Sequence, residues 1–199
     1  MEKYYVTISR QFGSLGRSIA HELSEMLEIE YYDRDIVEAT SKKMSLPVSA
    51  VSAQEEKSIK SNLFNMLFPL GTDPVEKQDK IFRVQQQIIL DIADKRSCIL
   101  VGRCADYILK DYKNCLNIFI YAPEKVRFDN CVNALEMKPE DAKKMIRDVD
   151  RARDLYWKRY AHYSPTDYTH RHLMIDSSIF GVTETARLLA DIVKRKFHL

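Results

Sequence analysis

Short apolar segments alternate with longer amphipathic ones along this sequence, and that alternation limits the fold more than any other feature. Strand-like segments, rich in apolar, β-branched and aromatic residues, occur at residues 4–9, 30–32, 97–102, 116–122 and 172–176. Helical patterns occupy residues 16–28, 74–95, 123–135, 139–159 and 183–197. Strands that are apolar on both faces and alternate with helices are typical of a covered parallel sheet. The sequence therefore predicts a doubly wound α/β fold with a five-stranded parallel sheet.

The length of 199 residues suits one domain, residues 1–199. Proline and glycine turns interrupt the alternation at residues 41–80, which we interpret as an insert. The net charge of +2 does not indicate a nucleic acid or an acidic membrane as partner. The chain shows no signal-peptide pattern and no apolar run near the roughly 20 residues that span a bilayer. We expect a soluble, cytoplasmic protein.

The cysteines and histidines do not form a recognisable metal-binding pattern. The four cysteines have neither CxxC nor zinc-finger spacing, so we interpret them as free thiols of a reducing compartment. His170 and His172 have HxH spacing, but the carboxylates or cysteines that would complete a metal site are missing nearby. No Ser/His/Asp set has the spacing expected for acyl transfer. The loop after the first strand is therefore the main candidate for chemistry.

That loop reads SRQFGSLGRS from residue 9 to residue 18 and leads directly into a helix. Glycines let the backbone approach a phosphate closely, and a helix N-terminus favours an anion through its free N–H groups. Gly16, Arg17 and Ser18 take the place of the final GK[ST] in the P-loop pattern GxxxxGK[ST]. Gln11 replaces the first glycine, and Arg17 replaces the lysine.

We predict a phosphate cradle made of Gly13, Ser14, Leu15, Gly16, Arg17 and Ser18. Arg17 would bind phosphate through its planar fork rather than through a compact charge. The Ser18 hydroxyl would be the protein ligand of Mg²⁺. The structural alternative is an ordinary turn with a solvated arginine and a polar residue in the first turn of the helix.

Charged residues also follow the second and third strands, at the edge where open α/β sheets bind their ligands. Asp33 and Arg34 follow the second strand, and Arg103 and Asp106 follow the third. Both arginines are therefore candidates for an anionic acceptor group. The structural alternatives are Asp33 as the cap of the next helix and a local pair between Arg103 and Asp106.

The helical segment at 139–159 carries a run of arginines and aspartates. Arg147, Asp150 and Arg153 share one face at helical spacing. Arginines that close over a moving phosphoryl group neutralise its charge, and closure excludes water. We therefore predict Arg147 and Arg153, together with Arg17, as catalytic residues. The alternative is a solvated helix whose ion pairs each contribute only about 0.2–0.5 kcal/mol.

These features together resemble the cytidylate kinase-like family of P-loop nucleoside monophosphate kinases. The resemblance rests on ISRQFGSLGRSIAHELSEML, YYDRDIV, VGRCADYIL, IFIYAP, the Asp/Arg-rich helix and the closing MIDSS, and it covers nearly the whole chain. Leu15 stands where members usually have glycine. The resemblance implies a P-loop three-layer sandwich with an acceptor-side helical insert at 41–80 and a helical lid over 136–165.

The resemblance also implies a reaction, in which the γ-phosphoryl group of ATP passes with Mg²⁺ to a nucleoside monophosphate, at family level CMP or dCMP. Small-molecule nucleotides are the implied partners. Arg127 resembles an arginine near the donor site. The acceptor-binding residues that it implies are Asp33, Arg34, Arg103, Asp106 and Asp150. A nucleotide-binding regulator without turnover, a kinase for another small acceptor, and a structural protein with a vestigial loop are the alternatives.

Overall fold

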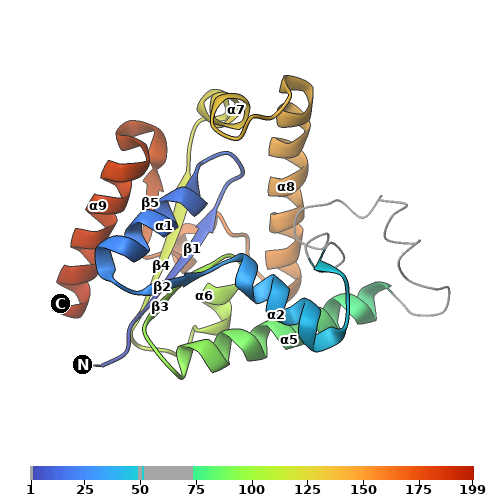
Figure 1. The fold of residues 1–199 in the computed structure, drawn as a ribbon, viewed down its shortest axis with the longest axis vertical. Helices are drawn as coiled ribbons and strands as arrows, with labels where there is room; N and C mark the ends of the chain where they lie inside the picture. The colour runs from blue at the N-terminus through green and yellow to red at the C-terminus, as the bar shows by residue number, and fades with distance from the viewer. Residues whose placement is uncertain (1, 49–50, 52–73) are drawn as a thin grey trace.

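The computed structural model describes residues 2–48, 51 and 74–199, and it contains the predicted parallel sheet (Figure 1). The strand order is β2-β3-β1-β4-β5, with every neighbouring pair parallel. Each strand lies within one residue of its predicted segment; the strands are β1 (Tyr5–Arg10), β2 (Glu30–Tyr32), β3 (Cys98–Val101), β4 (Cys115–Tyr121) and β5 (Leu173–Asp176). Because β1 lies between β3 and β4, the loop after it opens at the middle of the carboxyl edge of the sheet.

Helices connect the strands, and most of them match the predicted segments. These helices are α1 (Gly16–Leu27), α2 (Arg34–Met44), α5 (Pro74–Ala93), α7 (Glu124–Asn133), α8 (Pro139–Tyr160) and α9 (Ser177–Phe197). Two short elements were not predicted, because segments of their length have no detectable periodicity: the helix α6 (Ala105–Ile108) and the 3-10 turn η1 (Tyr168–His170). The predicted insert is described only at its ends, because residues 49–50 and 52–73 lie outside the described residues.

Helix α9 begins at Ser177, earlier than the predicted start at residue 183. The Asp176 carboxylate accepts a hydrogen bond from the Ser178 N–H at 2.9 Å and caps the first turn. Gly181, with φ of 70°, then breaks the helical geometry before the periodic part of the helix. This break explains why apolar periodicity located only the later part of α9.

The sheet is covered by helices on both faces (Figure 1). Along β1, Val6 and Ile8 pack beneath α1 and α9, whereas Tyr5 packs on the other face among residues of α5, α6 and α8. This division follows from the strand geometry, in which successive side chains point to opposite faces. The three-layer prediction is therefore confirmed, and β1 is held from both sides.

Helix α8 packs against the rest of the molecule along its length. Near its start, Ile146 packs with Cys131 of α7. Near its end, Tyr156 and Trp157 are buried in the core of the second face. These aromatic residues therefore hold the end of α8 against the core. Closure of residues 136–165 as a lid stays a prediction. A rigid movement of α8 would have to separate Tyr156 and Trp157 from that core.

The four cysteines are free and buried, as predicted for unpaired thiols. Burial raises the pKa of both Cys98 and Cys115 to about 12, so these thiols stay protonated at neutral pH and are poor nucleophiles. Within the part of the chain that the structure describes, no helix has the length and apolar character needed to cross a bilayer.

Candidate functional site

The loop between β1 and α1 presents several unpaired backbone donors. Gly13 has φ of 78°, and Leu15, at the N-cap of α1, has φ of 56°. Among the described residues, the N–H groups of Gly13, Leu15, Gly16, Arg17 and Ser18 have no hydrogen-bond acceptor. Free N–H groups at the start of a helix form a site to which an anion binds readily. The loop therefore has the backbone geometry of the predicted cradle.

Gly13 is required by its surroundings as well as by its backbone angle. A Cβ atom at this position would lie 2.7 Å from the Arg127 carbonyl oxygen and 2.9 Å from Cys131 Sγ. Asn130 Nδ2 also donates to the Gly13 carbonyl at 2.9 Å. Helix α7 therefore packs directly on the loop and holds its shape.

Ser14 and Gln11 support the loop from beneath. The buried Ser14 hydroxyl donates to the Gln11 carbonyl at 2.9 Å, and the Ser14 N–H donates to the same oxygen at 3.4 Å. The Gln11 side-chain oxygen accepts from the Ala122 N–H at 3.2 Å. Both donors of Ser14 are therefore used by the Gln11 carbonyl in this structure, and contact of Ser14 with phosphate stays a prediction.

Three arginines from separate elements surround the carboxylate of Asp33, which follows β2. Arg10 ends β1, Arg103 follows β3, and Arg17 lies in the first turn of α1. The Nη2 atoms of Arg10 and Arg103 each lie 3.6 Å from Asp33 Oδ1, and Arg17 Nε donates to Oδ2. The Arg17 side chain is 46% exposed, whereas the other three side chains are buried. One carboxylate thus faces three guanidinium groups, and the local field is positive.

This field keeps Asp33 ionised. Burial alone would raise the pKa of Asp33, but the charges of Arg10, Arg17 and Arg103 outweigh burial and lower it below the usual value. Asp33 Oδ1 has no hydrogen-bond partner among the described residues, although two of the arginines lie at ion-pair distance from it. The carboxylate therefore holds the guanidinium groups together without neutralising them, and the cluster can bind a further anion.

Of the five predicted acceptor residues, the ion pairs of this cluster contain two, Asp33 and Arg103. Asp33 occupies the N-cap position of α2, but its side chain faces the arginines and makes no cap hydrogen bond. Arg34 is exposed and forms no ion pair with Asp33. Arg10 contributes the third guanidinium, and the sequence did not predict it. Its position as the last residue of the central strand is the signal that indicates this role.

A second set of contacts joins α7 and α8 to the loop. Asp150 Oδ1 accepts from the Phe12 N–H at 2.7 Å, and Asp150 Oδ2 accepts from Arg127 Nη1 at 2.6 Å. Arg127 Nη1 also donates to the Phe12 carbonyl at 3.2 Å, and Arg153 Nη1 donates to the Arg10 carbonyl at 3.0 Å. Asp150, predicted on the acceptor side, thus supports the phosphate loop beside Arg127.

Arg147 and Asp106, which were also predicted as site residues, lie outside the ion-pair cluster of Asp33 and outside the contacts of Asp150. Arg147 is exposed on α8 and forms no ion pair within the described residues. Asp106 is buried, and its carboxylate accepts from Trp157 Nε1 at 3.2 Å and from the Tyr163 hydroxyl at 2.7 Å while pairing with Arg171. Asp106 is therefore paired with Arg171 in the structure, and its role in acceptor binding stays a prediction.

Ser18 fits a magnesium ion that arrives with a phosphate ligand. Its side chain is exposed in the first turn of α1. Mg²⁺ keeps several waters and takes one or two protein ligands together with phosphate oxygens, so a single hydroxyl is sufficient here. Within the described residues no group of three or more His, Cys, Asp or Glu side chains could hold a metal by itself.

We expect Asp150→Asn to lower the free energy of unfolding by about 1 to 2 kcal/mol, because a charged hydrogen bond to Arg127 is lost while the Phe12 N–H keeps an acceptor. Urea unfolding at neutral pH measures the change. Asp148→Asn, on the same helix, is the matched control and should change stability by no more than about 0.5 kcal/mol. Equal losses in the two variants would contradict a specific role for Asp150.

The fold is a covered parallel α/β sheet, and the loop after its central strand carries the degenerate P-loop pattern. The family model of the cytidylate kinase-like family matches residues 5–179. This chain therefore belongs to the cytidylate kinase-like family. No curated protein matches the sequence.

Solved structures share the fold over nearly the whole chain. An uncharacterized protein from Eubacterium ventriosum ATCC 27560 is 21% identical with a TM-score of 0.71, and the match covers 96% of this chain and 99% of that one. A shikimate kinase from Acinetobacter baumannii in complex with shikimate is 12% identical with a TM-score of 0.54, and the match covers 98% of this chain and 94% of that one. A gluconokinase from Sinorhizobium meliloti 1021 is 9% identical with a TM-score of 0.52, and the match covers 98% of this chain and 95% of that one. At these identities the likeness concerns the fold alone.

Proposed function

We propose that this protein transfers the γ-phosphoryl group of ATP to a nucleoside monophosphate, with CMP or dCMP as the acceptor. One observation carries the proposal. The unpaired N–H groups of the loop and the guanidinium groups of Arg10, Arg17 and Arg103 lie at the same edge of the sheet. Two adjacent anion sites are what a donor phosphate chain and an acceptor phosphate require.

The position of each residue then assigns it to the donor side or to the acceptor side of the proposed reaction. The loop N–H groups bind the donor phosphates, and the exposed Arg17 side chain reaches toward the moving group while Asp33 orients it. Arg10 and Arg103 hold the acceptor phosphate from the buried side of the cluster. Ser18 and the phosphates would hold Mg²⁺, which would supply neutralisation of the phosphate charge. Positioning and charge neutralisation carry most of phosphoryl transfer, so a dedicated base is not needed.

A kinase for another small hydroxylated acceptor is the second candidate. It is favoured by the shared fold with the shikimate kinase and the gluconokinase, whose acceptors are not nucleotides. The arginine cluster recognises an anionic group, which a carboxylate supplies as well as a phosphate does. The two candidates therefore differ in the acceptor and not in the donor side.

Product formation tests the proposal directly. Purified protein is mixed with Mg·ATP and a panel of nucleoside monophosphates, shikimate and gluconate, and the products are resolved by chromatography. CDP or dCDP is the expected product. Phosphorylated shikimate or gluconate without any nucleoside diphosphate would support the second candidate instead. ATP binding without any product would overturn both and support a regulator that binds nucleotide.

Arg103→Ala and Arg34→Ala form a matched pair for the acceptor site. We expect Arg103→Ala to raise the acceptor KM by roughly 10- to 100-fold, the range for a lost charged hydrogen bond, with a smaller effect on the ATP KM. Arg34→Ala should leave the acceptor KM within about twofold, because Arg34 is exposed outside the cluster. Steady-state kinetics measure both. A larger effect at Arg34 would restore it as the acceptor arginine.

A further inference from the structure

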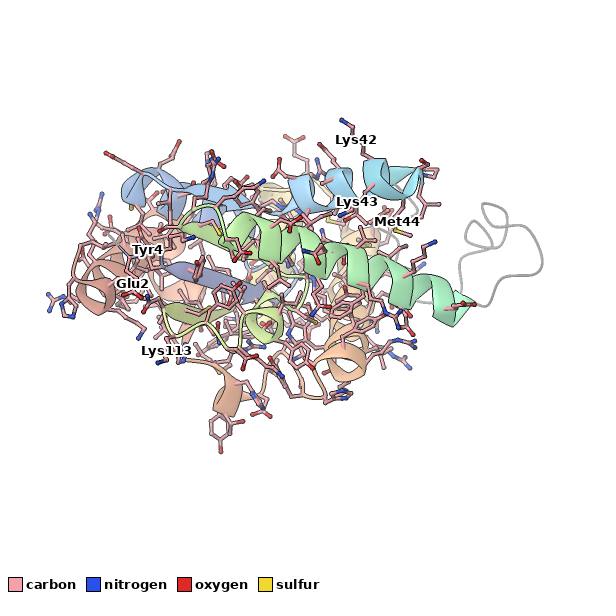
Figure 2. The ribbon with its side chains drawn as sticks, turned by 90° about the horizontal axis from the view of Figure 1, so that it is seen from below. Glu2, Tyr4, Lys42, Lys43, Met44 and Lys113 are labelled. Atoms are coloured by element: carbon pink, nitrogen blue, oxygen red, sulfur yellow. The ribbon has the colours of Figure 1, made fainter. Side chains whose placement is uncertain are left out.

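A polar groove lies at the amino edge of the sheet, which is the edge opposite the phosphate loop. It has a volume of about 630 Å³ and is lined by the turns after α6, the starts of β4 and β5, and the last turns of α9. Strand β4 runs for seven residues, Cys115 to Tyr121, between the two edges. At about 3.3 Å per residue, the groove and the loop lie about 20 Å apart. Figure 2 shows this side of the molecule, with Lys113 on it.

Cations outnumber carboxylates among the described residues that line the groove. Asp106 is the one carboxylate among its described lining residues, and it is shared by Trp157, Tyr163 and Arg171. His172 Nδ1 accepts from the Asn117 N–H at 2.9 Å, and its pKa is lowered by burial and then by the charges of Lys196 and Arg171. The lining cations are Lys110, Lys113, Arg171 and Lys196.

Arg171 forms the buried floor of this groove with one donor unsatisfied. Its side chain is 0% exposed. Nε donates to the Pro165 carbonyl at 2.9 Å, and Nη1 donates to Asp106. Nη2 has no hydrogen-bond partner within the described residues. The guanidinium is thus covered by its neighbours and neutralises Asp106 from beneath the groove, so no carboxylate of the described lining is left to pair with the lysines.

We propose that this groove binds a small phosphate-bearing anion at a site separate from the phosphate loop. The volume lies in the range of small-molecule sites. A phosphate group would pair with the exposed Lys110, Lys113 and Lys196, because the one carboxylate of the described lining, Asp106, is already paired with Arg171. The Tyr107 and Tyr112 side walls suit an attached organic group. The phosphate is either inorganic or the phosphoryl group of a small metabolite, and the site does not depend on the proposed transfer reaction.

The test is an NMR titration of the full chain with inorganic phosphate and, separately, with glucose 6-phosphate, at constant ionic strength. Saturable shifts are expected at the amides of Asn117 and of residues 169–172. These shifts should follow a binding curve distinct from the one given by the amides of residues 13–18. Binding at the phosphate loop is thereby measured separately. Equal affinity for the two probes would indicate inorganic phosphate, and tighter binding of the sugar phosphate would indicate a metabolite.

The double variant Lys113→Ser/Lys196→Ser should raise the groove Kd about tenfold, without changing the loop titration. Lys42→Ser/Lys43→Ser is the matched control, because these lysines lie on α2, away from Lys113 (Figure 2). It should leave the groove Kd unchanged. Shifts that do not saturate, or a groove Kd that is the same in both double variants, would overturn the proposal. Binding of single-stranded RNA but not of either phosphate probe would also overturn it.

Discussion

Replacing Asp33 with alanine should lower the free energy of unfolding by roughly 3 to 5 kcal/mol, the range for removing one partner from a buried ion pair. Asp33 is the carboxylate toward which Arg10, Arg17 and Arg103 converge, and two of these arginines are buried. Without it, the buried guanidinium groups repel one another at low dielectric. Urea unfolding at neutral pH, followed by circular dichroism, measures the loss.

The control for this variant is Asp35→Ala, which removes an exposed carboxylate from the first turn of α2. It loses only a favourable interaction with the helix dipole, so its effect should stay below about 1 kcal/mol. Similar losses in the two variants would contradict the role given to Asp33. Added sulfate or phosphate should partly restore the Asp33→Ala variant, because an anion can take the place of the carboxylate.

Acid should weaken the same interaction in the unaltered protein. The pKa of Asp33 is lowered in the folded state, so its contribution to stability is present above the usual value of 3.8. That contribution is lost as the pH falls through the lowered folded value. The stability of the Asp33→Ala variant should therefore depend less on pH in this range. An unchanged pH dependence would show that the arginines do not stabilise the ionised carboxylate.

Replacing Arg17 with alanine should reduce the rate of phosphoryl transfer by roughly 10²- to 10³-fold, the effect of removing one preorganised donor from a transition state. Its side chain is exposed beside the loop, and Asp33 holds its Nε. The fold should tolerate the change, since Asp33 keeps Arg10 and Arg103 as partners. Single-turnover measurements with saturating ATP and acceptor separate the chemical step from binding.

Two further variants define what Arg17 does. Arg17→Lys keeps the charge and removes the planar fork, so a partial rate would show that charge alone carries part of the effect. Arg195→Ala, in the last turn of α9, is a control that should keep the full rate. A full rate in Arg17→Ala would contradict its catalytic role and leave the loop N–H groups as the main phosphate contacts.

The order and type of the main elements could be predicted because their signals are local. Apolar runs located the five strands within one residue, and the periodicity of apolar residues located most of the helices. Helix α6 was missed because it is a single turn, and the start of α9 was missed because Gly181 interrupts its period. Boundaries of this kind depend on caps and backbone angles rather than on periodicity.

The candidate site could be predicted only in part. The loop and Arg103 were found because glycine, a helix start and a strand end are visible in one stretch of sequence. Arg10 was not predicted because the analysis of its loop concerned the glycines and the helix start, and Arg34 was chosen because it adjoins Asp33 in the chain. In the structure, Arg34 begins an exposed helical face, whereas Arg10 meets Asp33 across the sheet.

The sequence by itself determined the layered fold, the phosphate loop and the edge of the sheet where charged residues gather, because each depends on residues adjacent along the chain. Only the tertiary structure decided which charges meet. Asp33 joins arginines of three other segments, Asp150 supports the loop from α8, and Asp106 pairs with Arg171. The physical reason is that the energy of a charge pair depends on distance and burial, which are set by packing rather than by spacing along the chain.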